Sequence, residues 1–226
     1  MRISDDGFLI HKKPFSENKV LLSFFTPCHG RVNGIARASK RHPLDIGYYC
    51  ALKWSAKLDH QLGFIEYDFI ASPQSLLAHD YQKLLAFQSA VSLLYHLLVE
   101  HHPYPLLYKA FNDFIDNLAE DGWLYAYVQF EKKILEQLGF GLSLHACAVE
   151  GCRDKVVYLS PRSGRAVCAA SGEPYKDKLF SLPVVLIAPE GKDFKEALRI
   201  LGYFIKHHLL EGRSLMARDL FINAIE

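Results

Sequence analysis

Basic side chains interleaved with aromatic ones fill the first sixty residues of the chain. Residues 1–60 hold ten Lys or Arg against five Asp or Glu, residues 61–145 hold four against ten, and the whole chain carries +1. Cations that follow a phosphate backbone, with flat rings for base stacking, suit a sequence-indifferent binder of single-stranded nucleic acid. An unevenly charged solvated surface is the alternative interpretation. The candidate DNA-binding cations are Lys12, Lys13, Lys19, Arg31, Arg37, Lys40 and Arg41.

Six aromatic residues lie among these cations: Phe15, Phe24, Phe25, Tyr48, Tyr49 and Trp54. For each one we favour a place in the core over a stacking role, because a small barrel must fill its interior. Lys and Arg side chains have no place inside, so the run of cations is the stronger functional signal.

Three of the five cysteines lie within residues 144–172. Structural zinc needs four N or S ligands, usually as two closely spaced pairs. Four residues separate Cys147 from Cys152, and Ser171 stands where a partner for Cys168 would be. The candidate zinc ligands are therefore His145, Cys147, Cys152 and Cys168, but we favour free thiols and expect no cofactor.

The motifs of common catalytic sites are missing from the sequence. It has no G-x-S-x-G elbow, Walker loop, G-x-G-x-x-G or H-E-x-x-H. Asp5-Asp6 and Glu120-Asp121 are paired carboxylates, at a terminus and in an interhelix turn, where we expect solvated caps. We therefore interpret the chain as a non-enzyme.

The elements that must position the cations read as β-strands. Short segments rich in Val, Ile, Phe and Tyr, separated by Pro and Gly, predict strands at 7–11, 19–26, 31–38, 48–55 and 64–70. Five short strands in so few residues predict a small closed barrel, because closure removes the edges of the sheet. An OB-type barrel fits this count, and an SH3-like barrel is the alternative that the spacing leaves open.

After residue 72 the pattern becomes helical. Ser72 is expected as an N-cap and Pro73 in the first helical turn. Helices are predicted at 76–99, 106–118, 123–138, 194–210 and 215–225, with a loop-rich insert at 144–172. The expected fold class is α+β, with a barrel domain at 1–72 and an all-α helical domain at 73–226.

The sequence also indicates a compartment. No apolar run reaches the roughly 18 residues that span a bilayer, and no apolar segment follows Arg2 as in a secretory signal. An odd number of cysteines is typical of a reducing environment. We expect a cytoplasmic protein without a membrane partner.

Short motifs, in order along nearly the whole chain, resemble those of the bacterial recombination mediator RecO family. They are H-x-x-P-[YFW]-S-E at 11–17, T-x-x-H-G-R at 26–31, A-[KR] at 36–37, F-E-x-x-L-L-x-x-L-G-[YF]-G-x-x-L-x-x-C at 130–147, Y-x-S-P-x-x-G at 158–164 and L-x-x-R-x-[LF]-F at 215–221. Each motif is short, but the ordered set is fairly specific.

The resemblance implies an OB-fold N-terminal domain, then a helical domain with an embedded zinc-finger-like insert. It implies binding of single- and double-stranded DNA, annealing of complementary strands coated with single-strand-binding protein, and loading of the recombinase RecA together with RecR in the RecFOR pathway. The implied partners are RecR, the acidic C-terminal tail of single-strand-binding protein and, indirectly, RecA, in the bacterial nucleoid. Carried over by position, the DNA-facing cations are Lys12, Lys13, Arg31, Arg37, Lys40 and Arg41.

The sequence departs from the family pattern at three points. Glu150 and Ser171 stand where zinc-binding members have cysteines, Val128-Gln129 stand where basic residues often precede the F-E pair, and Ala38 replaces a common glycine. The alternative function is a non-catalytic adaptor whose basic barrel docks an acidic peptide tail.

Overall fold

The computed structural model describes residues 2–38, 44–57, 62–73, 77, 80–149, 152 and 154–225. Within these ranges no helix is both long enough and apolar enough to cross a membrane. The described residues group by contacts into two compact units, residues 1–119 with 215–221, and residues 120–214 with 222–226. Each unit is considered by itself.

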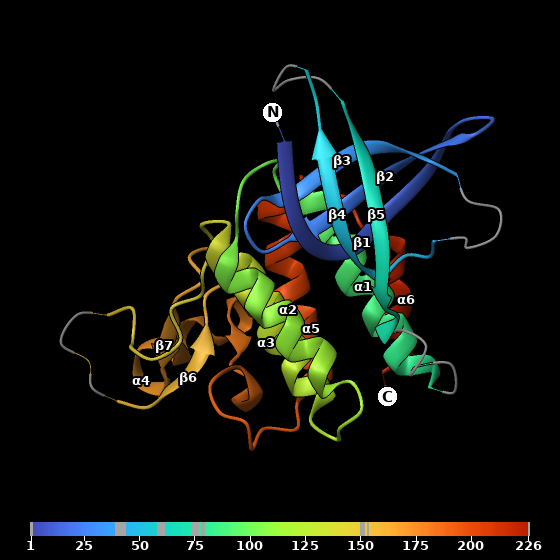
Figure 1. The fold of residues 1–226 in the computed structure, drawn as a ribbon. Coiled ribbons are helices and arrows are strands. Elements are labelled where there is room, and N and C mark those ends of the chain that lie inside the picture. Colours follow the sequence, from blue (N-terminus) through green and yellow to red (C-terminus); the bar gives the residue numbers. More distant parts are fainter. Residues whose placement is uncertain are drawn as a thin grey trace. The chain divides into compact units, whose positions relative to one another are not determined.

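Five strands of the first unit form a closed barrel in the order β1-β2-β3-β5-β4 (Figure 1). Their bounds are β1 Arg2–Ser16, β2 Lys19–Thr26, β3 Gly30–Arg37, β4 Tyr49–Ser55 and β5 Gly63–Ala71. All neighbouring pairs are antiparallel except β3 and β5, which run parallel, and β1 closes the barrel because it pairs with both β2 and β4. The five predicted strands are thus all present.

Strand β1 is longer than the sequence predicts. Residues Arg2–Phe8 pair with β4, and residues Phe8–Ser16 pair with β2, with a register shift between Leu9 and His11. Residues 2–6 of this strand were not predicted, because Ile3 is the only buried hydrophobic residue among them and the others are an Arg, a Ser and two Asp. The barrel interior is filled by large side chains, among them Phe24 and Trp54.

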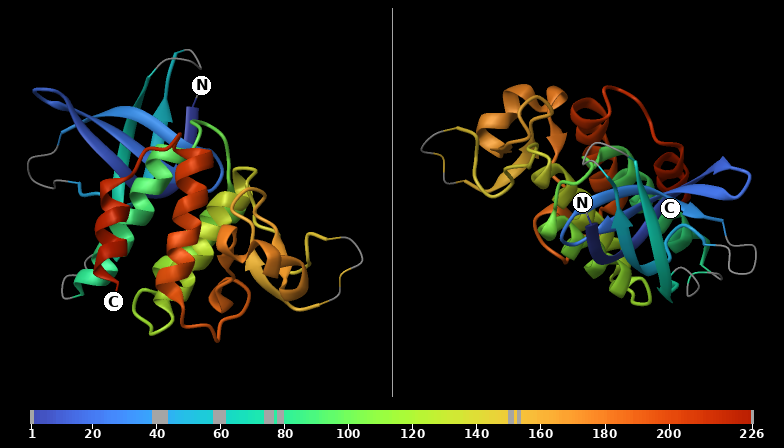
Figure 2. Two further views of the ribbon diagram at one scale, coloured as in Figure 1. Left: turned by 180° about the vertical axis from the view of Figure 1, so that it is seen from behind. Right: turned by 45° about the horizontal axis from the view of Figure 1, so that its top comes forward.

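Helices α1, Tyr81–Leu97, and α2, Pro105–Asn117, lie below the barrel strands in Figure 1 and in the left view of Figure 2. Phe111 of α2 packs edge-on against Phe8 of β1 at 5.1 Å between ring centroids. Pro73, directly after the predicted N-cap Ser72, is in a 3-10 turn, whereas the α-helix α1 begins only after Asp80, whose side chain accepts a hydrogen bond from Lys83 N at 3.1 Å. Helix α6 covers Met216–Ala224.

The second unit combines helices with a small sheet, so the expectation of an all-α domain is wrong there. Helices α3, Trp123–Gln137, and α5, Phe194–Phe204, carry its apolar faces, and α5 continues into the π-helical turn η4, Ile205–Leu209. A three-stranded sheet has the order β7-β6-β8, Ala166–Cys168, Val156–Leu159 and Phe180–Ser181, of which β6 and β7 lie in the predicted insert 144–172 and β8 follows it. Short helical segments flank this sheet: α4 Ala169–Gly172, η2 Glu173–Lys178 and η3 Val184–Leu186.

The barrel ends at Ala71, close to the domain boundary expected at residue 72. By contacts, however, α1 and α2 group with the barrel rather than with the later helices. The contact units therefore divide the chain at other positions than the expected domains, whose boundaries stay a prediction.

Candidate nucleic-acid interface

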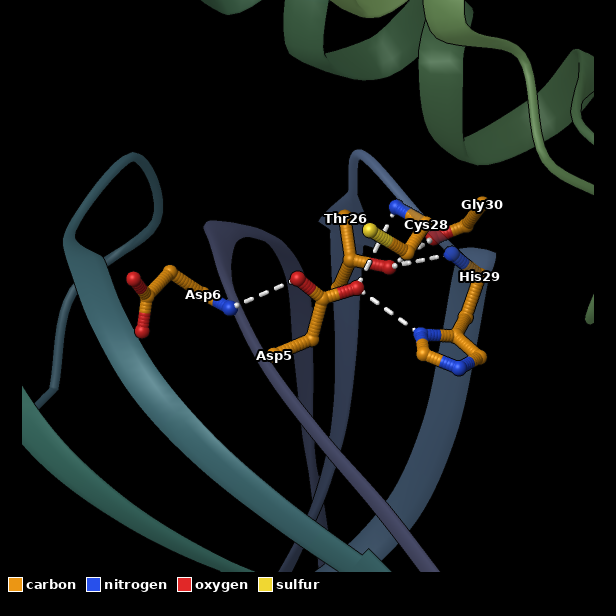
Figure 3. Close-up of polar contacts among 6 residues, drawn as sticks. All are labelled: Asp5, Asp6, Thr26, Cys28, His29 and Gly30. Carbon is orange, nitrogen blue, oxygen red and sulfur yellow. Dashed lines mark hydrogen bonds and ion pairs between the residues drawn. The ribbon is translucent and has the colours of Figure 1, made fainter.

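The turn between β2 and β3 is fixed to the first half of β1 by Asp5 (Figure 3). The Asp5 carboxylate accepts a hydrogen bond from the backbone N–H of Cys28 at 3.2 Å and lies 2.8 Å from His29 Nδ1. Within the turn, Thr26 Oγ1 accepts from His29 N and donates to Gly30 O, both at 3.2 Å. The Asp5 side chain is only 8% exposed, so the expectation of a solvated cap is wrong for it.

Gly30 brings this turn against the segment that follows α1. Its φ of +65° lies in the left-handed region, and a Cβ at this position would overlap the backbone oxygen of His102. Directly after it, Arg31 O accepts a hydrogen bond from His101 N at 2.9 Å. Glycine is thus required twice here, by the backbone conformation and by the close approach.

Arg31, a predicted DNA-binding cation, is engaged with the end of α1. Its Nη1 donates to Tyr95 O at 2.7 Å, and its guanidinium carbon lies 5.7 Å from the centroid of the Tyr95 ring. A guanidinium at the last turn of a helix satisfies a carbonyl without an intrahelical partner and opposes the negative end of the helix dipole. Arg31 therefore has a structural role besides any contact with DNA.

Lys12 and Lys13 lie side by side on β1 but have different surroundings. Lys12 Nζ donates to Leu44 O at 2.7 Å and pairs with Asp45 Oδ1 at 3.0 Å, which offsets its charge. Both lysines line a cavity of about 240 Å³ with an otherwise apolar lining: Pro14, Val20, Leu22, Ala38, Leu44 and Tyr67. Lys13 is exposed, and within the described ranges it has no ion pair.

Lys19 and Arg37 lie directly opposite each other at the ends of β2 and β3. Both are exposed, and in the described part of the chain neither is in an ion pair. Lys19 Nζ lies 5.8 Å from the centroid of the Phe64 ring, and Phe64 is 57% exposed at the start of β5. We call Lys19, Arg37 and Phe64 the Lys19–Arg37 surface. It presents two cations and a flat ring to solvent.

The remaining predicted cations, Lys40 and Arg41, lie outside the described residues. Of the aromatic residues considered, Phe24, Phe25 and Trp54 are buried in agreement with a core role, whereas Phe15 is 53% exposed. Phe64 is not among the functional residues predicted from the sequence. The available signal was its place as the first large residue after Gly63, directly behind a loop.

The structure brings together three of the four candidate zinc ligands. The Sγ atoms of Cys147, Cys152 and Cys168 all lie within 4.8 Å of one another, and His145 is not part of this group of described residues. Ser171 Oγ lies 3.3 Å from Cys168 Sγ, and Ser171 N donates to that sulfur at 3.4 Å. The contact with the Ser171 hydroxyl, followed by that with the Ser171 backbone N–H, lowers the pKa of Cys168 to about 7. The donor set thus fits three positions of a tetrahedral zinc site and leaves the fourth unassigned.

Two family models together match most of the chain. The model described as "Recombination protein O N terminal" matches residues 1–71, and "Recombination protein O C terminal" matches residues 78–216. These matches meet at the end of the barrel, between β5 and α1.

Curated relatives resemble the chain over nearly its whole length. A DNA repair protein RecO of Anaplasma marginale (strain St. Maries) is 36% identical over 221 residues, which is 93% of this chain and 93% of the relative. The protein of the same name from Rickettsia canadensis (strain McKiel) is 32% identical over 100% of this chain and 97% of its own. The protein of the same name from Rhodospirillum rubrum is 34% identical over 98% of this chain and 95% of its own.

Proposed function

The chain belongs to the recombination protein O family, and on that premise we propose that it is a DNA-binding recombination mediator in DNA repair. Its relatives are named DNA repair proteins, which supports the repair role. The specific steps of the proposal, from strand binding to recombinase loading, depend on the surface described above.

The Lys19–Arg37 surface is the observation that carries the proposal. Like charges directly opposite each other on neighbouring strands destabilise a sheet, so two unpaired cations in register imply an external counter-charge. A nucleic-acid backbone provides a row of such charges, and an exposed ring beside it provides a platform for a base. The combination of Lys19, Arg37 and Phe64 therefore suits single-stranded DNA.

We assign the barrel to the OB type, whose binding face uses strands 2 and 3 and the loops between strands 1 and 2 and strands 4 and 5. Lys19 follows the β1–β2 turn, Arg37 ends β3, and Phe64 follows the loop between β4 and β5. The three side chains of the Lys19–Arg37 surface thus come from the segments that this barrel type uses to bind oligonucleotides.

The proposed action needs no catalytic group. Cations that neutralise phosphates on two strands lower their mutual repulsion, so complementary strands anneal without a nucleotide cofactor. We propose that the protein, which we regard as a non-enzyme, anneals strands coated with single-strand-binding protein and helps to load RecA together with RecR. Its proposed contacts are single- and double-stranded DNA, RecR and the acidic tail of single-strand-binding protein, in the bacterial nucleoid.

A double variant tests the surface directly. Lys19→Ala/Arg37→Ala removes two phosphate contacts, so binding of a fluorescent single strand weakens and the salt dependence of log K becomes shallower by about 0.7 for each lost contact. The matched control is Lys109→Ala/Arg199→Ala, which removes two exposed cations that are already paired with Asp113 and Glu196. Fluorescence anisotropy over a salt series measures both quantities.

The proposal requires the two double variants to differ. Equal binding and equal salt slopes for both would contradict the placement of DNA on the Lys19–Arg37 surface. Wild-type binding that does not change with salt would contradict DNA binding through phosphates altogether.

One observation supports the adaptor as a second candidate function. The 240 Å³ cavity on the barrel has room for an apolar side chain, and the exposed Lys13 lines it and is available for a carboxylate of an acidic peptide. A length series separates the two functions. Affinity that rises with oligonucleotide length supports the DNA mediator, and saturation by one short acidic peptide that displaces DNA supports the adaptor.

A further inference from the structure

A second group of basic and aromatic side chains lies where β1 meets the last turn of α1, and it shares no residue with the Lys19–Arg37 surface. His11 of β1 stacks on Tyr95 of α1, with ring centroids 3.9 Å apart and planes inclined by 14°. Tyr95 also contacts the Arg31 guanidinium, and His96 follows it in the chain. We call His11, Lys13, Arg31, Tyr95 and His96 the His11–His96 group.

His96 has one ring nitrogen available for an external partner. Its Nδ1 lies 2.8 Å from Ser92 O, and a carbonyl only accepts, so Nδ1 carries the hydrogen. The side chain is exposed, and Nε2 is the atom that gains a proton when the ring becomes charged. An anion at Nε2 would therefore favour the charged form.

The His11–His96 group has an excess of positive charge. Burial lowers the pKa of His11 from its usual value, and the further causes are the positive charges of His96, Lys13 and Arg31, with no carboxylate among the groups that act on it. The backbones of Glu100 and Arg31 form a parallel β-bridge. The Glu100 carboxylate, however, pairs with His101, with Oε1 3.5 Å from His101 Nε2. Within the described residues, the group thus lacks a counter-anion of its own.

We propose that the His11–His96 group binds a phosphate of the DNA backbone and that His11 and His96 take up protons when it does. The inference rests on the DNA-binding function proposed above and adds a second contact and a pH dependence to it. A phosphate beside an imidazole favours the imidazolium form, just as the three cations around His11 disfavour it. Binding and protonation are then reciprocally linked.

The sign of the pH dependence follows from this linkage. In the free protein near pH 8 the His11 ring is neutral, since burial and the neighbouring cations lower its pKa below the usual histidine value of about 6.5. The DNA complex holds more protons than its separate parts, so affinity rises as the pH falls. The gain is at most about tenfold per pH unit for each proton taken up.

The test measures anisotropy of a fluorescent oligothymidylate between about pH 8 and about pH 6, at constant ionic strength. We expect wild-type affinity to rise by about tenfold or more, and His11→Gln and His96→Gln each to lose part of that rise. At about pH 8 both variants should bind nearly as well as wild type. The matched control is His207→Gln, because exposed His207 Nδ1 also lies 2.8 Å from the carbonyl four residues earlier, Tyr203 O.

Direct measurement of proton uptake covers the case in which a variant folds poorly. Calorimetric titration of wild type with DNA near pH 7, in two buffers of different ionisation enthalpy, should show net proton uptake. Zero uptake, or a pH response in His11→Gln and His96→Gln equal to that of His207→Gln, would overturn the inference. Failure of wild type to bind DNA at every pH would instead overturn the proposed function.

Discussion

At the scale of single residues, Gly30 places the β2–β3 turn against the segment after α1. Its conformation has a positive φ, and the oxygen of His102 occupies the space where a side chain would begin. This position is also the glycine of the T-x-x-H-G-R motif, whose Arg31 reaches the end of α1. The motif therefore has a structural explanation that is independent of DNA.

Gly30→Ala should lower the free energy of unfolding by about 3 kcal/mol, because left-handed strain and overlap with a backbone atom add together. Gly139→Ala is the matched control: its φ is +88°, but a Cβ there meets no atom within 4 Å. Gly139→Ala should lower the free energy of unfolding only by the strain of the left-handed backbone conformation, about 1–2 kcal/mol. Urea unfolding measures both, and equal losses would show that Gly30 does not need the close approach.

The charged residues were predicted from the sequence, but their surroundings were not. Composition and position identified Lys19, Arg31 and Arg37 alike, because all three are cations on strands. Only the folded chain separates them: Lys19 and Arg37 face solvent opposite each other, whereas Arg31 is held by Tyr95 from a helix 64 residues later. For the same reason Phe64, Tyr95 and His96 were not predicted as functional residues: the basic residues with which they interact lie far from them in the sequence.

At the scale of elements, the pairing of β2 with β3 sets like charges against each other. Arg37→Gln removes the repulsion from Lys19 and should raise the free energy of unfolding by about 0.2–1 kcal/mol, while DNA affinity falls. Lys109→Gln serves as the comparison, because it breaks the ion pair with Asp113 and should cost up to about 0.5 kcal/mol. Thermal unfolding measures the expected gain in stability of Arg37→Gln, and anisotropy on the same samples measures the expected loss of DNA affinity. A less stable Arg37→Gln protein would contradict the repulsion argument.

Strand β4 and the start of β5 were predictable because buried and more exposed side chains alternate along them, and β2 because it is a short run of mostly apolar residues. The first half of β1 was missed because its outward positions carry Ser4 and Asp6 and its inward side is short of large residues. The start of α1 was misplaced because Ser72-Pro73 is a good local start signal, whereas Asp80 makes the capping bond. The small sheet β7-β6-β8 has strands of two to four residues, too short for a periodic signal.

At the scale of the whole molecule, charge is unevenly distributed along the chain: a basic segment, residues 1–60, precedes an acidic one, residues 61–145. The cations of the barrel have a polyanion as their expected partner. Contacts divide the chain into two compact units, and the strongest cationic features, Lys19, Arg37 and the His11–His96 group, all belong to the first. DNA binding is thus assigned to that unit.

The most direct measurement of the central claim is annealing of complementary fluorescent strands coated with single-strand-binding protein, without any nucleotide. We expect wild type and Lys109→Ala/Arg199→Ala to anneal these strands at similar rates. Lys19→Ala/Arg37→Ala, shown to be folded by circular dichroism, should anneal them much more slowly and approach the wild-type rate only at lower salt. Annealing by wild type that requires ATP, or the absence of annealing by wild type at low salt, would contradict the account. Equal rates for the two double variants would contradict the assignment of this surface.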